Sequence, residues 1–102
     1  MADHVTFFRM KAQPGKAQAV IDQFAKWEGE HKGQAKGFLR SIVVRSNDDP
    51  DELMAGVRFD SAASYAANSD RPETDAWYSG LRALLAADPD WFNGTLAREV
   101  IG

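Results

Sequence analysis

Cysteine is absent from the 102-residue chain, and several kinds of site are excluded with it. Without a thiol the chain cannot form a disulfide scaffold, a thiolate zinc site, an iron–sulfur cluster or a cysteine nucleophile. Histidine is scarce, so imidazole chemistry is limited to His4 and His31. The acids at 48–52 lack the spacing of a calcium loop and are typical of a solvated turn. We therefore expect no metal, and since the sequence has no phosphate loop or dinucleotide fingerprint, we expect no cofactor either.

Long apolar runs and an excess of positive charge are also missing. No run approaches the roughly 20 residues of a membrane span. The start of the chain, Met1-Ala2-Asp3-His4, has neither the basic region nor the apolar core of a signal peptide. With 12 Lys and Arg against 15 Asp and Glu, the net charge is −3, which gives no electrostatic reason to bind nucleic acid or an anionic membrane. We expect a single cytoplasmic domain over residues 1–102 that binds neither.

Aromatic residues, by contrast, are plentiful: the chain has three Trp, six Phe and two Tyr. Each large ring buries about 150–250 Å². Either the core is rich in aromatics for its size, or some of these rings line a pocket or a subunit interface.

The periodicity along the chain predicts four strands and two helical regions. Strands are expected at 5–10, 38–45, 53–59 and 92–101. A helix is expected at 16–31, and the second helical region, from 62 to before Asp88, is interrupted at 68–70, with Asp70 as the cap of its second part. The order βαββαβ is that of a ferredoxin-like α+β fold, in which right-handed crossovers place the helices on one face of a four-stranded antiparallel sheet.

The first strand needs apolar cover on both of its faces. Phe7 and Phe8 are adjacent, so they point to opposite sides of the sheet. Since the helices cover one face only, a second copy of the chain is the simplest cover for the other. The sequence therefore predicts a homodimer.

Four short segments carry a resemblance to a known family. They are Val5-Thr6-Phe7-Phe8-Arg9-Met10, the turn Pro14-Gly15, Gly37-Phe38-Leu39 and Val57-Arg58-Phe59-Asp60-Ser61. In order and spacing they resemble the antibiotic biosynthesis monooxygenase (ABM) family of the dimeric α+β barrel superfamily. The resemblance implies a dimeric barrel with a pocket between the helices and the sheet of each subunit.

The resemblance also implies a choice of activities. Some members oxidise quinol-type aromatics with oxygen and without cofactor or metal, others bind and degrade haem, and others have no established reaction. The haem-degrading branch has an Asn on the first strand and a ligating His in the second helical region. Here the strand offers Thr6 and Arg9, and the segment around Trp77 has no His, so haem is the less favoured alternative.

The leading hypothesis is a cofactor-independent monooxygenase acting on a small aromatic or quinol; the alternative is a non-catalytic ligand-binding or interaction domain. In the first case His31, Arg9 and Tyr65 are the candidate catalytic residues. The candidate substrate-binding residues are Trp77, Asn68, Arg40, Arg58 and Tyr78.

Each candidate also has a structural interpretation. Trp77 shares a helical stripe with leucines that is typical of a core. His31 lies where an imidazolium meets the negative end of a helix dipole. The arginines can pair with acids, and Asn68 can cap the helix break.

Overall fold

The computed structural model describes residues 2–102 as strands and helices in the order βαββααβ. The strands are β1 (His4–Lys11), β2 (Phe38–Arg45), β3 (Glu52–Phe59) and β4 (Asp90–Thr95). The helices are α1 (Ala17–Glu30), the single 3-10 turn η1 (Lys32–Gln34), α2 (Ala62–Ser69) and α3 (Pro72–Arg82). The predicted alternation of strands and helices is confirmed, with the second helical region divided into α2 and α3.

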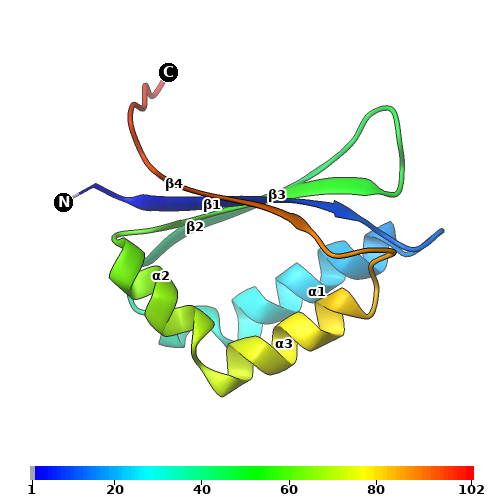
Figure 1. Ribbon diagram of the computed structural model, residues 1–102, viewed down its shortest axis with the longest axis horizontal. Helices are drawn as coiled ribbons and strands as arrows, with labels where there is room; N and C mark the ends of the chain where they lie inside the picture. Colours follow the sequence, from blue (N-terminus) through cyan, green and yellow to red (C-terminus); the bar gives the residue numbers. More distant parts are fainter. Residues whose placement is uncertain (1) are drawn as a thin grey trace.

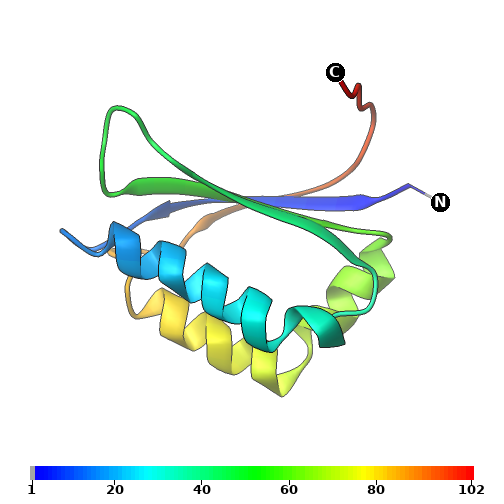
Figure 2. The same ribbon diagram turned by 180° about the vertical axis from the view of Figure 1, so that it is seen from behind.

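The four strands form one antiparallel sheet in the order β2-β3-β1-β4. In both ribbon views the helices lie on one side of this sheet, and the other side carries no helix; the β2–β3 loop and the chain end beyond β4 rise on that side (Figures 1 and 2). The ferredoxin-like α+β fold expected from the sequence is therefore confirmed.

Alternation along β1 divides its side chains between the two faces of the sheet. Thr6, Phe8 and Met10 are buried against the helices, whereas Phe7 and Arg9 are exposed on the bare face. In-register neighbours of adjacent strands point to the same side, so β3 and β4 follow the same rule, and β2 follows it from Arg40 onward, after a register shift between Phe38 and Arg40. We call the sheet surface that bears Phe7 and Arg9 the open face.

The core lies between the sheet and the apolar stripes of α1 and α3. Val20, Phe24 and Trp27 follow one another at spacings of four and three and form the buried stripe of α1. Leu81 of α3 and Leu85, just beyond that helix, are buried in the same cluster as Phe24. These contacts hold α1 and α3 against the sheet.

The cap predicted for the second part of the helical region is wrong. Asp70 is the C-cap of α2, and Arg71 is the N-cap of α3 with no side-chain capping bond. The physical reason is Pro72, whose ring disfavours the helical conformation of the residue before it. Arg71 accordingly has φ −70° and ψ 135°, so the chain is extended between the two helices.

The last strand also differs from its predicted bounds. It begins at Asp90 rather than Phe92 and ends at Thr95 rather than Ile101. The helix before it ends early, at Arg82, because Leu85 instead forms a bridge with Ala12 and the Ala86 amide donates to the Lys11 carbonyl oxygen at 2.8 Å. This pairing turns the chain so that the following residues run antiparallel to β1 and form β4.

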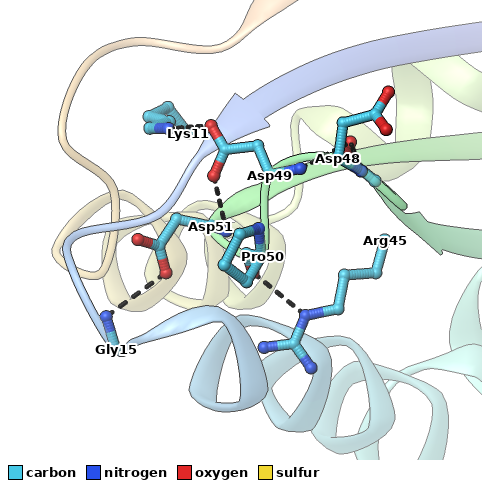
Figure 3. A network of polar contacts seen from close by, with 8 residues as sticks. Lys11, Gly15, Arg45, Asp48, Asp49, Pro50 and Asp51 are labelled. Atoms are coloured by element: carbon cyan, nitrogen blue, oxygen red, sulfur yellow. Dashed lines mark hydrogen bonds and ion pairs between the residues drawn. The ribbon is translucent and has the colours of Figure 1, made fainter.

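The acidic turn between β2 and β3 is fastened to the neighbouring turn of the chain (Figure 3). Asp49 pairs with Lys11 of β1 and accepts a bond of 2.9 Å from the Asp51 amide, while Asp51 Oδ1 accepts from the Gly15 amide at 3.3 Å. Hydrogen bonding to Lys11, and then to the Asp51 amide, lowers the pKa of Asp49 below its usual value. Within residues 2–102 no group of three or more His, Asp or Glu side chains is arranged to hold a metal ion.

Candidate functional site

A pocket opens between the helices and the covered face of the sheet. Its volume is about 500 Å³, including the part that is open to solvent. Most of its wall is apolar and comes from rings of the sheet, α1 and α3, namely Phe8, Phe24, Trp27, Phe59, Trp77 and Trp91, together with Val57. Apolar walls of this kind are typical of small-molecule sites.

The rings around the pocket are in contact with one another. Phe8 stacks on Trp91 with ring centroids 4.7 Å apart, and Phe24 meets the edge of Trp77 at 5.2 Å. Chains of such contacts link every Trp, Tyr and Phe ring except Phe7 and Phe92, which face each other across β1 and β4 on the open face. The excess of aromatics in the sequence therefore serves the pocket wall and the core together.

Polar groups enter the pocket mainly from α2 and its neighbours. The polar lining residues are Ser41, Tyr65, Asn68, Ser69 and Thr74. Tyr65 and Asn68 are three residues apart, so they share a face of α2. The start of that helix is fixed by Ser61, whose Oγ accepts from the Ser64 amide at 3.0 Å. A capped α2 thus presents a phenol and a carboxamide to the same space.

Asn68 is the most deeply buried of these polar residues, with only 8% of its surface exposed. Its Oδ1 accepts a long bond of 3.4 Å from Thr74 Oγ1, and its Nδ2 forms no hydrogen bond within residues 2–102. The only fully buried side-chain nitrogen or oxygen left without a partner in that range is Nη1 of Arg71. Nδ2 is therefore not fully enclosed and can donate to a ligand oxygen; Asn68 lines this pocket and also a hollow that it forms with Ala35, Ala67 and Arg71.

Trp77 is fixed to α1 by its indole nitrogen. Nε1 donates to the Gln23 carbonyl oxygen at 2.6 Å, and Gln23 Nε2 donates back to the Trp77 carbonyl oxygen at 2.9 Å. The indole N–H is thus already engaged, and Trp77 offers the pocket an apolar wall rather than a hydrogen bond.

The pocket wall carries no charged side chain from the described part of the chain; its one titratable group is the Tyr65 phenol. The arrangement can enclose a planar apolar molecule and donate hydrogen bonds to one of its oxygens. A full proton transfer to a protein base would need a group from elsewhere.

His31 and Tyr78 lie outside the pocket wall. His31 is the C-cap of α1, and its Nε2 is 3.7 Å from an oxygen of the neighbouring Glu30. Tyr78 packs behind the wall, with its ring centroid 5.9 Å from that of Trp91. Burial, and then the charge of Asp88, raises the pKa of Tyr78, so its phenol is a poorer acid than usual.

The three candidate arginines lie on the open face, away from the pocket. Arg9 is exposed and in register with Met54, while Arg40 lies opposite Arg58. Arg58 donates to Asp3 at 2.7 Å through Nε and to Glu99 at 2.6 Å through Nη1, and these carboxylates, Glu99 foremost, raise its pKa further. The structure therefore brings Tyr65, Asn68 and Trp77 together and separates them from Arg9, Arg40, Arg58, His31 and Tyr78.

In a comparison with protein-family models, residues 4–79 match the model of antibiotic biosynthesis monooxygenases. The match covers most of the chain. The chain belongs to the ABM family. No curated protein matches its sequence.

Solved structures extend this result to the fold of the ABM chain. A protein of Chloroflexus aurantiacus J-10-fl has a TM-score of 0.78 and 24% identity, over 99% of this chain and 100% of that one. SnoaB of Streptomyces nogalater, a cofactor-independent oxygenase solved as the N63A mutant, has a TM-score of 0.81 and 18% identity, over 99% and 98%. A Nitrosomonas europaea protein of unknown function, NE2512, has a TM-score of 0.79 and 19% identity, over 100% and 96%. At such identities the likeness concerns the fold.

One group of residues in this ABM chain escaped the sequence analysis. His4, Thr6 and Asn93 are joined by hydrogen bonds beside Tyr65, on the covered face of the sheet. The period of two in β1 puts His4 on the same face as Thr6, which is a usable signal. Their link to Asn93, however, depends on the register of β1 with β4. In residues 2–102 of this ABM chain no helix is both long and apolar enough to cross a membrane.

Proposed function

We propose that the chain is a cofactor-independent monooxygenase that oxidises a small aromatic or quinol in the pocket beneath the sheet. The observation that carries this proposal is the buried Asn68, with an unused Nδ2 donor, in a pocket whose wall is mostly made of aromatic rings. The rings suit a planar substrate, and the amide suits its hydroxyl or developing oxyanion. Tyr65, on the same face of α2, supplies its hydroxyl as a second hydrogen-bond donor.

The chemistry requires the substrate to lose a proton before it meets oxygen. Hydrogen bonds to the anion lower the pKa of a phenol, so Asn68 and Tyr65 would favour the phenolate within the pocket. An electron-rich phenolate transfers an electron to dioxygen, and the two radicals combine at a ring carbon. For an anthrone, the ring CH2 becomes a carbonyl with one oxygen atom of O2, and the second oxygen leaves as water.

The proton of the substrate goes to water in this proposal. Tyr65 is the only titratable residue among those that line the pocket in the described chain. His31 and the three arginines are not part of the proposed site. The protein's own contribution is to orient the ring, stabilise its anion and keep bulk water from the radical pair.

The comparisons support the proposal without fixing the substrate. The family is that of antibiotic biosynthesis monooxygenases, and SnoaB, which has the same fold, is named as a cofactor-independent oxygenase. Its 18% identity carries the fold but not the residues of the reaction.

Oxygen uptake with anthrones and quinols as substrates tests the proposal. We expect uptake by the wild-type chain without added metal or cofactor, and a loss of about 10² in kcat for Asn68→Ala, the scale reported for one oxyanion donor. Asn47→Ala is the matched control, because Asn47 is exposed in the β2–β3 turn. If well-folded protein takes up no oxygen with any member of the panel, the proposal is wrong.

A non-catalytic ligand-binding domain is the second candidate. It is favoured by the absence of a charged acid or base from the pocket wall of the described residues. In that case an aromatic ligand such as 1-naphthol binds with an affinity that depends on Asn68, while no substrate is consumed. Calorimetric titration next to the oxygen assay separates the two functions.

We also propose that the chain is one domain that pairs with a second copy through the open face. Phe7, Ile42, Val44, Met54 and Phe92 are all large apolar residues exposed on that face, at 37–67%. Burial of apolar surface contributes about 25 cal/mol per Å². The family resemblance likewise implies a homodimer.

A further inference from the structure

We propose that His4 is a positioning residue of the pocket: a hydrogen-bond chain through the buried Thr6 fixes its ring, and that ring holds α2 in place over the site. His4 is the first residue of β1. His4 shares the covered face with Thr6 and lies in register with Phe59 of β3 and Thr95 of β4. Its ring is stacked on that of Tyr65, with centroids 4.5 Å apart and planes at 29°.

Two short hydrogen bonds hold the His4 ring in this position. Nε2 is 2.7 Å from Thr6 Oγ1, and Thr6 Oγ1 donates to Asn93 Oδ1, also at 2.7 Å. Thr6 is completely buried, His4 is partly buried and Asn93 is exposed, so both bonds are made at partly buried positions. A buried hydroxyl that lost a partner would destabilise the fold, which makes the chain a strong constraint.

The direction of the hydrogen bonds sets the tautomer of His4. A hydroxyl has a single proton, and that of Thr6 is given to Asn93. Thr6 can then only accept from His4, so Nε2 of His4 carries a hydrogen. The ring is thereby fixed in one tautomer and one orientation.

α2 depends on this ring because it has few other attachments to the sheet. Of its eight residues only Asn68 is buried, and Ser64 and Tyr65 are partly buried. The Tyr65 ring lies against two residues of the sheet, His4 by stacking and Phe59 by its edge at 5.5 Å. Since Tyr65 and Asn68 share one face of α2, a shift of the Tyr65 ring moves the Asn68 amide as well.

The first test examines the hydrogen-bond chain of His4, Thr6 and Asn93 in the protein without any ligand. Thr6→Val has nearly the same shape and removes the acceptor of His4. In ¹⁵N spectra of the imidazole we expect the wild type to show the Nε2–H tautomer and Thr6→Val to show a mixture. Hydrogen exchange of the amides at 66–69 should become about fivefold to tenfold faster, the equivalent of one lost hydrogen bond, with α1 unchanged. Thr95→Val, at the exposed residue opposite His4, is the matched control.

The second test separates the effect of the His4 ring from the effect of its hydrogen bonds. His4→Phe keeps a ring for Tyr65 to stack on, and His4→Ala does not. We expect the exchange of α2 to rise less in His4→Phe than in His4→Ala, and the affinity for 1-naphthol to fall in the same order. If Thr6→Val leaves both the tautomer and the exchange of α2 as in the wild type, the positioning role is wrong. The same holds if His4→Phe and His4→Ala behave alike.

The link from His4 to a substrate rests on the proposed function, whereas the tautomer and the exchange rates do not. A wild-type chain that takes up no oxygen, yet shows the Nε2–H tautomer and a loosened α2 in Thr6→Val, would overturn the proposed function alone. Oxygen uptake that depends on Asn68, with no response of α2 to Thr6→Val, would overturn the role of His4 alone.

Discussion

Gln23 and Trp77 hold each other by two hydrogen bonds that run in opposite directions between α1 and α3. The indole Nε1 donates to the Gln23 carbonyl oxygen at 2.6 Å, and the Gln23 amide donates to the Trp77 carbonyl oxygen at 2.9 Å. These two bonds fix α1 and α3 relative to each other at the wall of the pocket. The pocket itself stays open.

Replacing either partner is expected to lower the free energy of unfolding. Gln23→Leu removes one bond, for a loss of about 1 kcal/mol, and Trp77→Phe removes the other together with part of a packed ring, for about 2–3 kcal/mol. Urea denaturation provides the measurement. Gln18→Leu is the control, since Gln18 bonds only to Asp22 on the exposed side of α1 and should stay within about 0.5 kcal/mol of the wild type. Equal effects of Gln18→Leu and Gln23→Leu would contradict the interpretation.

Tyr65 has two roles that one substitution can separate. Tyr65→Phe keeps the ring that stacks on His4 and removes only the hydroxyl. We expect the melting temperature to change little, while the affinity for 1-naphthol falls about fivefold to tenfold through the loss of one hydrogen bond. Tyr65→Ala should lower both. An unchanged affinity in Tyr65→Phe would remove the phenol from the proposed site.

The fold could be predicted because local patterns determine it. The pattern of residues 38–45 predicts a strand, and the structure has one there. In β1, Thr6, Phe8 and Met10 alternate with Phe7 and Arg9, as expected for a strand whose two faces differ in their surroundings. The boundary at Arg71 was missed because a strong local signal, the cap pattern beginning at Asp70, competed with the effect of Pro72 on its neighbour.

The pocket was harder to predict, because it depends on which face of each strand the helices cover. β1 has apolar residues on both faces, so its own pattern does not tell whether Arg9 points to the pocket or away from it. The side to which Arg9 points is known only once the register of β1 with β3 is known, which pairs Arg9 with Met54 and Phe8 with Ala55. This register joins residues far apart in the sequence. The link from His4 to Asn93 likewise needs the pairing of β1 with β4.

Gly37 is a position that only glycine can occupy without a rearrangement. Its φ is +83°, and a Cβ atom there would lie 2.4 Å from Asp60 Oδ1 and 2.6 Å from Ser64 Oγ. Gly37→Ala should therefore lower the free energy of unfolding by about 1–3 kcal/mol and displace the start of α2. Gly33→Ala is the control, because its Cβ would meet nothing within 4 Å. Equal melting temperatures for the two variants would contradict this prediction.

The pair of Asp49 and Lys11 makes stability depend on pH at the acidic end. The pKa of Asp49 is lowered in the fold by Lys11, so the carboxylate stabilises the protein above its unfolded pKa of about 3.9. This stabilisation is lost as the pH falls through the lower, folded pKa. Asp49→Asn should therefore be less stable than the wild type at pH 7, with the gap closing below about pH 4. Melting temperatures between pH 2 and 7 measure it, and a gap independent of pH would contradict the prediction.

The open face should lose its partner when one of its exposed apolar residues becomes charged. Phe92 is 67% exposed and lies opposite Phe7, so in a dimer through this face Phe92→Asp would bury an unpaired carboxylate. We expect light scattering to show a dimer for the wild type at micromolar concentration and a monomer for Phe92→Asp and Ile42→Asp. Ala25→Asp, on the exposed side of α1, should remain a dimer. Because Phe92 and Ile42 are exposed in the single chain, their variants should still fold, and the helical signal in circular dichroism checks this. A folded Phe92→Asp that stays dimeric, or a monomeric wild type, would show that the open face does not join two copies.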